Sequence, residues 1–182
     1  MENKPIRLLI CGLPGTGKTW MANALAKELG PSAAVFDGDE VRVAARIWDF
    51  SPAGRQWQAE TMNGLCASAE RGGRISIASF ICPTAQLRET FRWGNDRTFV
   101  IWLNRESPKA QQFPDTLKLF QPLGLHPRDP VHFKISHWQN RATEHQLVLK
   151  RLRKWGAIAG AEGPPAESAP AEGRENKIEE GD

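Results

Sequence analysis

Residues 11–20, CGLPGTGKTW, are the stretch that decides the fold of this chain. Within them, residues 12–19 follow the pattern G-x-x-x-x-G-K-T, which is typical of a loop that binds the phosphates of a nucleotide. Glycines in such a loop let the backbone pass close to phosphate oxygens while its N–H groups point inward. The pattern lies between an apolar segment and a helical segment, where such loops are found, which argues against a chance match.

Each part of the loop has an expected task in nucleotide binding. Lys18 is predicted to reach the β- and γ-phosphates and to act in catalysis, and the hydroxyl of Thr19 is predicted to bind Mg²⁺. A helix that begins at Lys18 adds the positive end of its dipole. The expected cofactors are therefore ATP and Mg²⁺, and the residues expected to bind them are Gly12, Leu13, Pro14, Gly15, Thr16, Gly17, Lys18 and Thr19.

Apolar segments on either side of this loop predict strands that alternate with helices. Strands are expected at 6–11, 33–36, 74–81, 98–103 and 131–136. Helices are expected at 18–29, from Asp39 onward, and at 53–71, 84–93 and 139–155, with a long functional loop at 104–130 that has room for one helical turn. This alternation predicts an α/β fold whose parallel sheet is covered by helices on both faces, with ligands at the carboxyl ends of the strands.

Two aspartates follow the second predicted strand, where they would face the phosphate loop across the crevice. One of Asp37 and Asp39 can accept a proton from an attacking hydroxyl, and Asp37 can also hold Mg²⁺ through water, together with Thr19. The alternative for Asp39 is that it only caps the next helix. Arg42 lies one turn further along and can clamp an anionic acceptor, unless it is an ordinary surface charge.

The third predicted strand lacks a residue that many nucleotide-hydrolysing proteins with this loop carry. Such proteins often end this strand with an aspartate for Mg²⁺, whereas here ISIASFICP (75–83) contains Ser79 and no acid. This difference disfavours a motor, a switch or a hydrolase. It favours a small kinase, in which acidic residues elsewhere serve the metal.

Four motifs together resemble those of adenylylsulfate kinases: GLPGTGKT (12–19), DGDEVR (37–42), FSPAGRQWQAE (50–60) and ISIASFICPTAQLRETFR (75–92). The resemblance implies a P-loop kinase fold, a three-layer sandwich with a five-stranded parallel sheet in the order 2-3-1-4-5, and phosphorylation of a hydroxyl by Mg-ATP. It also implies that Asp39 accepts a proton or orients the metal. The residues expected at the acceptor are Arg42, Arg55, Ser79, Ile81, Arg88 and Arg92, the last because it shares a helix face with Arg88.

The second half of the chain departs from that family. Thr84 and Ala85 replace an aromatic and basic pair, the family's lid is only faintly echoed in RESPKAQQ (105–112), and the chain has no tyrosine. The segments ICPT (81–84) and FPDT (113–116) also resemble short bacteriophage kinases, some of which phosphorylate 5-hydroxymethyluracil within DNA. That base in modified DNA is the favoured acceptor, and adenylylsulfate or another anionic small molecule is the alternative. A nucleotide-dependent binding module without turnover is a third possibility.

Charge and composition are compatible with a DNA partner. The last 26 residues carry seven acidic and two basic side chains; because the whole chain has a net charge of +3, residues 1–156 carry +8. A basic surface attracts phosphates, KRLRK (150–154) can contact a backbone, and Trp48, Trp57 and Trp93 can stack on an extruded base.

The chain of 182 residues is expected to form one kinase domain over 1–156, followed by a disordered acidic tail over 157–182. No apolar run has the length of a membrane span and no signal peptide is recognised, so a cytoplasmic protein without membrane contact is expected. Three cysteines without C-x-x-C spacing are expected to be buried thiols.

Overall fold

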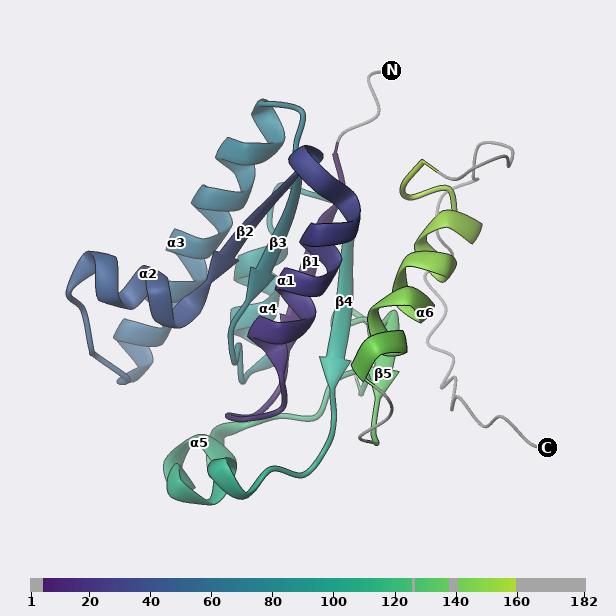
Figure 1. Ribbon diagram of the computed structural model, residues 1–182. Coiled ribbons are helices and arrows are strands. Elements are labelled where there is room, and N and C mark those ends of the chain that lie inside the picture. Colours follow the sequence, from purple (N-terminus) through teal and green to yellow (C-terminus); the bar gives the residue numbers. More distant parts are fainter. Residues whose placement is uncertain (1–4, 126, 138–140, 160–182) are drawn as a thin grey trace.

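The computed structural model describes residues 5–125, 127–137 and 141–159. Its centre is a parallel sheet of five strands in the order β2-β3-β1-β4-β5 (Figure 1), which confirms the predicted α/β fold and strand order. The strands are β1 (Arg7–Cys11), β2 (Ala33–Asp37), β3 (Ile75–Ser79), β4 (Thr98–Leu103) and β5 (Phe133–Ile135).

The helices lie close to their predicted positions. They are α1 (Lys18–Leu29), α2 (Gly38–Ala45), α3 (Pro52–Arg71), α4 (Ala85–Arg92), α5 (Pro114–Leu119) and α6 (Arg141–Lys154), with short 3₁₀ turns η1 (Gly30–Ser32) and η2 (Pro108–Gln112). The segment 104–130, predicted as a long loop, contains both η2 and α5. Each of these begins at a proline, whose fixed φ favours the first position of a helix.

Two hydrophobic cores lie on opposite faces of the sheet, because successive side chains of a strand point to opposite sides. In β1, Leu8 and Ile10 belong to one core, and Leu9 and Cys11 belong to the other. The first core is completed by α1 and α6 through Met21, Leu25, Val148, Leu149 and Leu152. The second is completed by α3 and α4 through Ala59, Met62, Cys66, Leu87 and Phe91. The predicted three layers are therefore present, and all three cysteines are buried free thiols.

Arg7 is a buried charge within an otherwise apolar strand. Its guanidinium pairs with Glu70 of α3 at 2.7 Å and donates further hydrogen bonds to the Asn63 side chain and the Phe91 carbonyl oxygen. A buried charge is tolerated when it is paired and hydrogen-bonded in this way. The contacts fix α3 and α4 to the amino end of β1.

Arg88 of α4 is also fully buried. Its fork meets both carboxylate oxygens of Asp129, at 2.7 and 2.6 Å, and it donates to the carbonyl oxygens of Cys82 and Gln121. Arg88 therefore fastens the far end of the segment 104–130 to α4.

The packed chain extends beyond the boundary predicted at residue 156. Ile158 is buried in the core formed with α1 and α6. The rest of the predicted tail, residues 160–182, lies outside the described residues. Within the described part of the chain, no helix combines the length and apolar character needed to cross a membrane.

His132 extends the pairing of β4 with the edge strand β5. Its backbone N–H donates to the Val100 carbonyl oxygen at 3.0 Å, and its Nδ1 accepts from the Val100 N–H at 3.0 Å. The accepting nitrogen must be unprotonated. Burial, assisted by the charge of Arg92, lowers the pKa of His132 to about 4.

We expect His132 to make unfolding easier in acid. The unfolded chain binds a proton on this ring near pH 6.5 and the folded chain only near pH 4, so stability is lost as pH falls through that window. His132→Asn keeps an acceptor but does not titrate. In urea unfolding, the advantage of the wild type over this variant should shrink by about 2–3 kcal/mol between pH 7 and pH 4. An advantage that is independent of pH would contradict the assignment.

A second prediction concerns the Arg88–Asp129 pair. Asp129→Ala leaves a buried guanidinium without its carboxylate and should lower the free energy of unfolding by about 3–5 kcal/mol. The double variant Arg88→Met/Asp129→Leu buries no charge and should be more stable than the single variant in the same urea titration. If both variants lose the same stability, the unpaired charge is not the cause.

Candidate active site

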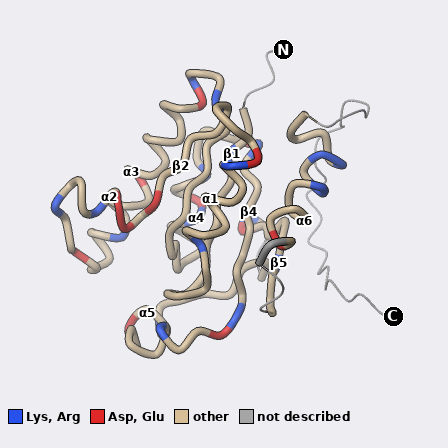
Figure 2. Tube along the Cα trace, viewed as in Figure 1, with Lys and Arg blue, Asp and Glu red and all other residues tan. Residues whose placement is uncertain are grey.

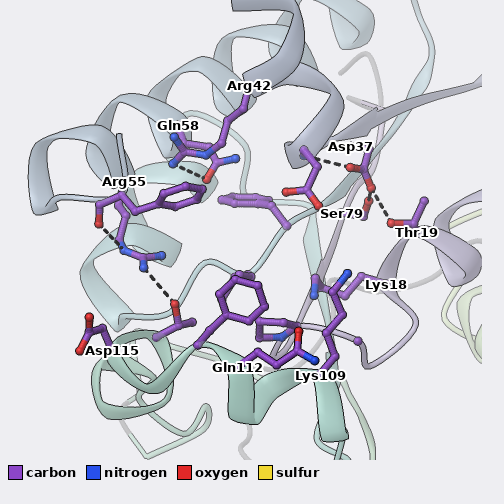
Figure 3. A pocket seen from close by; sticks show the side chains of 18 of the residues that line it. Lys18, Thr19, Asp37, Arg42, Arg55, Gln58, Ser79, Lys109, Gln112 and Asp115 are labelled. Atoms are coloured by element: carbon purple, nitrogen blue, oxygen red, sulfur yellow. Dashed lines mark hydrogen bonds between the residues drawn. The ribbon is translucent and has the colours of Figure 1, made fainter. Parts of the chain in front are cut away.

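A cavity of about 690 Å³ opens at the carboxyl ends of the central strands (Figure 3). Its wall combines the phosphate loop, the ends of β2 and β3, the starts of α2 and α3, and residues 109–116 of the long connecting segment. This is the edge of the sheet at which the alternation of strands and helices predicted that ligands bind.

The phosphate loop has the backbone geometry that its glycines predict. Gly12 has a φ of +148°, and a Cβ atom there would lie 2.6 Å from the Leu103 carbonyl oxygen. Of the eight predicted loop residues, those on the cavity wall are Pro14, Gly15, Gly17, Lys18 and Thr19. The other three, Gly12, Leu13 and Thr16, do not line the cavity. The Thr16 hydroxyl donates to the Leu13 carbonyl oxygen at 2.9 Å within the loop.

Lys18 lies at the start of α1 and faces the cavity. Its Nζ donates to the Leu13 carbonyl oxygen at 2.9 Å. Burial lowers the pKa of Lys18 to about 8, and the nearby positive charge of Lys109 acts in the same direction. Figure 3 shows the two lysines reaching toward each other from the phosphate loop and from η2. Two cations that crowd one space favour a ligand with several negative charges.

Asp37 is the centre of a hydrogen-bond cluster that joins three elements. Its Oδ2 accepts from the hydroxyls of Thr19 at 2.7 Å and Ser79 at 2.6 Å, and its Oδ1 accepts from the Asp39 N–H at 2.9 Å. Asp37 is therefore the residue that caps α2. Because the Thr19 hydroxyl hydrogen points to Asp37, the lone pairs of that oxygen stay available for a metal ion.

The Asp37–Ser79 contact shows where an acid lies in relation to the end of β3, which carries a serine in place of an aspartate. The two residues are register partners at the ends of the neighbouring strands β2 and β3. A carboxylate at the end of β2 thus stands beside the position where many nucleotide hydrolases carry theirs on β3.

Asp39 lies in the first turn of α2, on the cavity wall. Its side chain is exposed, and its carboxylate has no hydrogen-bond partner among the described residues. The alternative that Asp39 is merely a helix cap is wrong, because Asp37 fills that role. The Asp39 carboxylate is therefore uncommitted and lies where a ligand can reach it.

Arg42 reaches the cavity wall, but its guanidinium is engaged with the protein. Its Nη1 donates to the carbonyl oxygens of Ile47 and Asp49, and its Nη2 donates to the Gly54 carbonyl oxygen and the Gln58 side chain. These four bonds use all four Nη hydrogens. The arrangement does not support the predicted anion clamp; Arg42 instead fixes the connection between α2 and α3.

Arg55 is the predicted acceptor arginine that lies on the cavity wall and keeps spare Nη hydrogens. Its Nε donates to the Phe50 carbonyl oxygen at 3.0 Å, and its Nη2 donates to the Thr116 hydroxyl at 3.1 Å. The second bond ties α3 to α5 across the cavity (Figure 3). Ser79 and Ile81 also lie on the wall, as predicted.

The structure does not support the prediction that Arg88 and Arg92 bind the acceptor. Neither residue lines the cavity. Arg88 is buried against Asp129, and its i+4 neighbour Arg92 points the same way and donates to the Arg128 carbonyl oxygen at 2.7 Å. The helix face that carries both arginines packs against the end of the segment 104–130, because a buried guanidinium needs acceptors that this segment supplies.

Sequence reasoning named Trp48 as a stacking residue and it lies on the cavity wall, but it missed the other two aromatic residues of the rim and Lys109. Trp48, Phe50 and Phe113 line the cavity although 59%, 50% and 43% of their surfaces are exposed. Large aromatic side chains left open at a cavity indicate a site for a planar or apolar group. The segment 105–112 adds Lys109 to the cavity wall. Lys109 is the only lysine of this segment, and that is the one sequence signal that could have identified it as a site residue.

The segment 105–112 lies directly on the phosphate loop. A Cβ atom on Gly15 would approach the Ser107 Oγ to 2.2 Å and the Lys109 Cβ to 2.9 Å. This close approach explains why glycine is needed at position 15, where φ is +80°. It also brings Lys109 to the mouth of the loop.

Other features that were expected to contact DNA lie elsewhere. Trp57 and Trp93 are not part of the cavity wall. The basic end of α6, which contains residues 150–154, lies away from α5 (Figure 2), and none of its residues lines the cavity.

Comparison with known proteins agrees with this geometry. The family model for adenylylsulphate kinase matches residues 4–112. No curated protein sequence matches the chain significantly. Among solved structures, the adenylylsulfate (APS) kinase of Mycobacterium tuberculosis, in complex with AMPPNP and APS, is 20% identical, with a TM-score of 0.67 over 82% of this chain and 98% of that one.

Two further structures show the same fold. The hexameric APS kinase of Thiobacillus denitrificans is 20% identical, with a TM-score of 0.67 over 87% of this chain and 30% of that one. A gluconokinase of Sinorhizobium meliloti is 14% identical, with a TM-score of 0.62 over 84% and 94%. Because the family match spans more than half of the 182 residues and includes the phosphate loop and both aspartates, this chain belongs to the adenylylsulfate kinase family of P-loop kinases.

Proposed function

We propose that this chain transfers the γ-phosphoryl group of ATP to a hydroxyl of a small acceptor that binds at the aromatic rim of the cavity. The observation that carries the proposal is the single cavity shared by the phosphate loop, the uncommitted carboxylate of Asp39 and the exposed rings of Trp48, Phe50 and Phe113. A donor site and an acceptor site then lie on either side of one proton acceptor.

The donor side suits Mg-ATP. The N–H groups of the loop and the charge of Lys18 bind the phosphates, and Lys109 stands opposite to neutralise charge on the transferred group. Thr19 is the residue that would bind Mg²⁺ directly, since Asp37 takes its hydroxyl hydrogen. When bound, Mg²⁺ neutralises the phosphate oxygens.

The proton balance of the reaction assigns a role to Asp39. Asp39 accepts the proton of the acceptor hydroxyl while the hydroxyl oxygen bonds to the γ-phosphorus. The bond from that phosphorus to the β,γ-bridging oxygen breaks, and ADP leaves with the electron pair.

Adenylylsulfate is the first candidate acceptor. Family membership favours it, and its adenine ring suits the exposed rings of Phe50 and Phe113. Arg55 can donate to its anionic part, because only its Nε and Nη2 have partners among the described residues.

The second candidate is 5-hydroxymethyluracil, free or in DNA. One observation favours it: Arg42 and Arg88 are bonded to other parts of the protein. The acceptor end of the cavity therefore offers fewer positive charges to an anion than the sequence predicted, which suits an uncharged base. Neither the family match nor the similar structures point to DNA, and the residues expected to contact its backbone lie away from the cavity.

Radiolabelled ATP offered with a panel of acceptors tests the proposal. We expect label transfer to adenylylsulfate, and none to a plain thymine duplex. Transfer to 5-hydroxymethyluracil DNA alone would replace the first candidate with the second. Binding of ATP without transfer to any hydroxyl would favour a nucleotide-dependent binding module. Lys18→Ala, which lacks the phosphate-binding charge, identifies label transferred by a contaminating kinase.

Asp39→Asn should lower kcat about 10²-fold or more, the effect expected when a proton acceptor is removed. ATP affinity and melting temperature should stay close to those of the wild type, because the carboxylate bonds to no described residue. Glu40→Gln is the matched control, since Glu40 is the next residue of α2 and does not line the cavity. Equal rates for the two variants would remove Asp39 from the mechanism.

The aromatic rim makes a separate prediction. Phe113→Ala should raise the KM for the acceptor about tenfold, the upper part of the range for loss of one stacking ring, and leave the KM for ATP unchanged. Leu119→Ala, at an exposed residue of α5 that does not line the cavity, is the control. A rise in the KM for ATP instead would place the donor nucleotide, not the acceptor, against this ring.

A further inference from the structure

Arg105 connects the phosphate loop to the last helix. It follows β4 by two residues and is buried, with 5% of its surface exposed. Its Nε donates to the Thr16 carbonyl oxygen at 2.9 Å, and its Nη1 donates to the His137 carbonyl oxygen at 3.3 Å. Both Nη atoms also meet the carboxylate of Glu144 in α6, at 2.7 and 3.1 Å.

The bond to Thr16 determines which way one peptide of the loop faces. The peptide between Thr16 and Gly17 is trans, so its C=O and N–H point in opposite directions. With the Thr16 carbonyl oxygen held toward Arg105, the Gly17 N–H is directed to the other side of the loop. Gly17 lines the cavity and is the N-cap residue of α1, with a φ of +91° that glycine adopts readily.

Glu144 makes this arrangement possible although it does not line the cavity. The side chains of Arg105 and Glu144 are each only 1% exposed. A guanidinium at such a place needs a carboxylate to offset the loss of water, and a bidentate carboxylate also fixes its orientation. The Nε–H is thereby aimed at the phosphate loop.

We propose that Arg105 is a positioning residue for nucleotide binding, oriented by Glu144, and that its hold on Thr16 presents the Gly17 N–H to the phosphates. The inference rests on the proposed binding of ATP at the phosphate loop. If the Arg105–Glu144 pair served stability alone, its loss would lower the Tm and leave the affinity for phosphate ligands unchanged.

Two conservative variants test this role. Arg105→Lys keeps the positive charge, but one ammonium group cannot reproduce the fork to Glu144 together with the bond to Thr16. Glu144→Gln keeps the shape and removes the charge that orients Arg105. The matched control is Glu70→Gln, which weakens the buried Arg7–Glu70 pair, also 2.7 Å long, at the amino end of β1. Calorimetry gives the Kd for ATP and for inorganic tripolyphosphate, and thermal unfolding gives the Tm.

Arg105→Lys and Glu144→Gln are each expected to raise the Kd for ATP and for tripolyphosphate by the same factor, about ten- to a hundredfold. The equal factor is expected because the phosphates, not the base, contact the loop. Glu70→Gln should lower the Tm by a similar amount and leave both Kd values within about twofold of the wild type.

Unchanged phosphate affinity in folded Arg105→Lys and Glu144→Gln would overturn the inference. An equal loss of affinity in Glu70→Gln would also overturn it, because general loosening would then be the cause. If the wild type itself binds no ATP, the proposed function fails, which is a different result from binding that the variants leave unchanged.

Discussion

The site depends on one constraint: the loop between β1 and α1 must present N–H groups to the cavity while its carbonyl groups are bonded elsewhere. The Leu13 carbonyl oxygen accepts from Thr16 and Lys18, and the Thr16 carbonyl oxygen accepts from Arg105. These contacts come from the loop itself and from the segment after β4. Close packing of Gly12 on the Leu103 carbonyl oxygen leaves no room for a side chain there. The loop therefore has its phosphate-binding shape before any ligand binds, which lowers the entropic cost of binding.

The parallel sheet supplies the remaining chemistry by bringing strand ends together. Asp37 ends β2, Ser79 ends β3, and both contact each other beside Thr19 of the phosphate loop. The acid at the end of β2 therefore lies beside the position on β3 where many other P-loop proteins carry theirs. Asp39, two residues further on, is turned into the cavity by the helix that Asp37 caps. Asp37 joins β2, β3 and the phosphate loop, whereas the carboxylate of Asp39 is left open to the cavity.

Arginine is the residue type whose role depends most on context in this protein. Arg42, Arg55 and Arg88 belong to motifs that resemble substrate-binding motifs, yet of these three only Arg55 combines a place on the cavity wall with spare Nη hydrogens. A guanidinium has five N–H groups, and when it is buried the protein must satisfy most of them. The same residue type can therefore clamp a ligand or hold two segments together, and the acceptors around it decide which. The aromatic rim then becomes the most distinctive part of the acceptor end.

Sequence by itself determined the strands, most helices, the sheet order through its family resemblance, and the phosphate loop, because these depend on local periodicity and on glycine spacing. It also placed Asp37 and Asp39 at the cavity, since residues after parallel strands share one edge of the sheet, and Ser79 and Ile81 through the family resemblance. Tertiary structure alone decided that Arg88 is internal, that Lys109 faces Lys18 and that Glu144 reaches the phosphate loop through Arg105. These outcomes join residues far apart in the chain, and burial and hydrogen-bond partners, which no local pattern records, select among them.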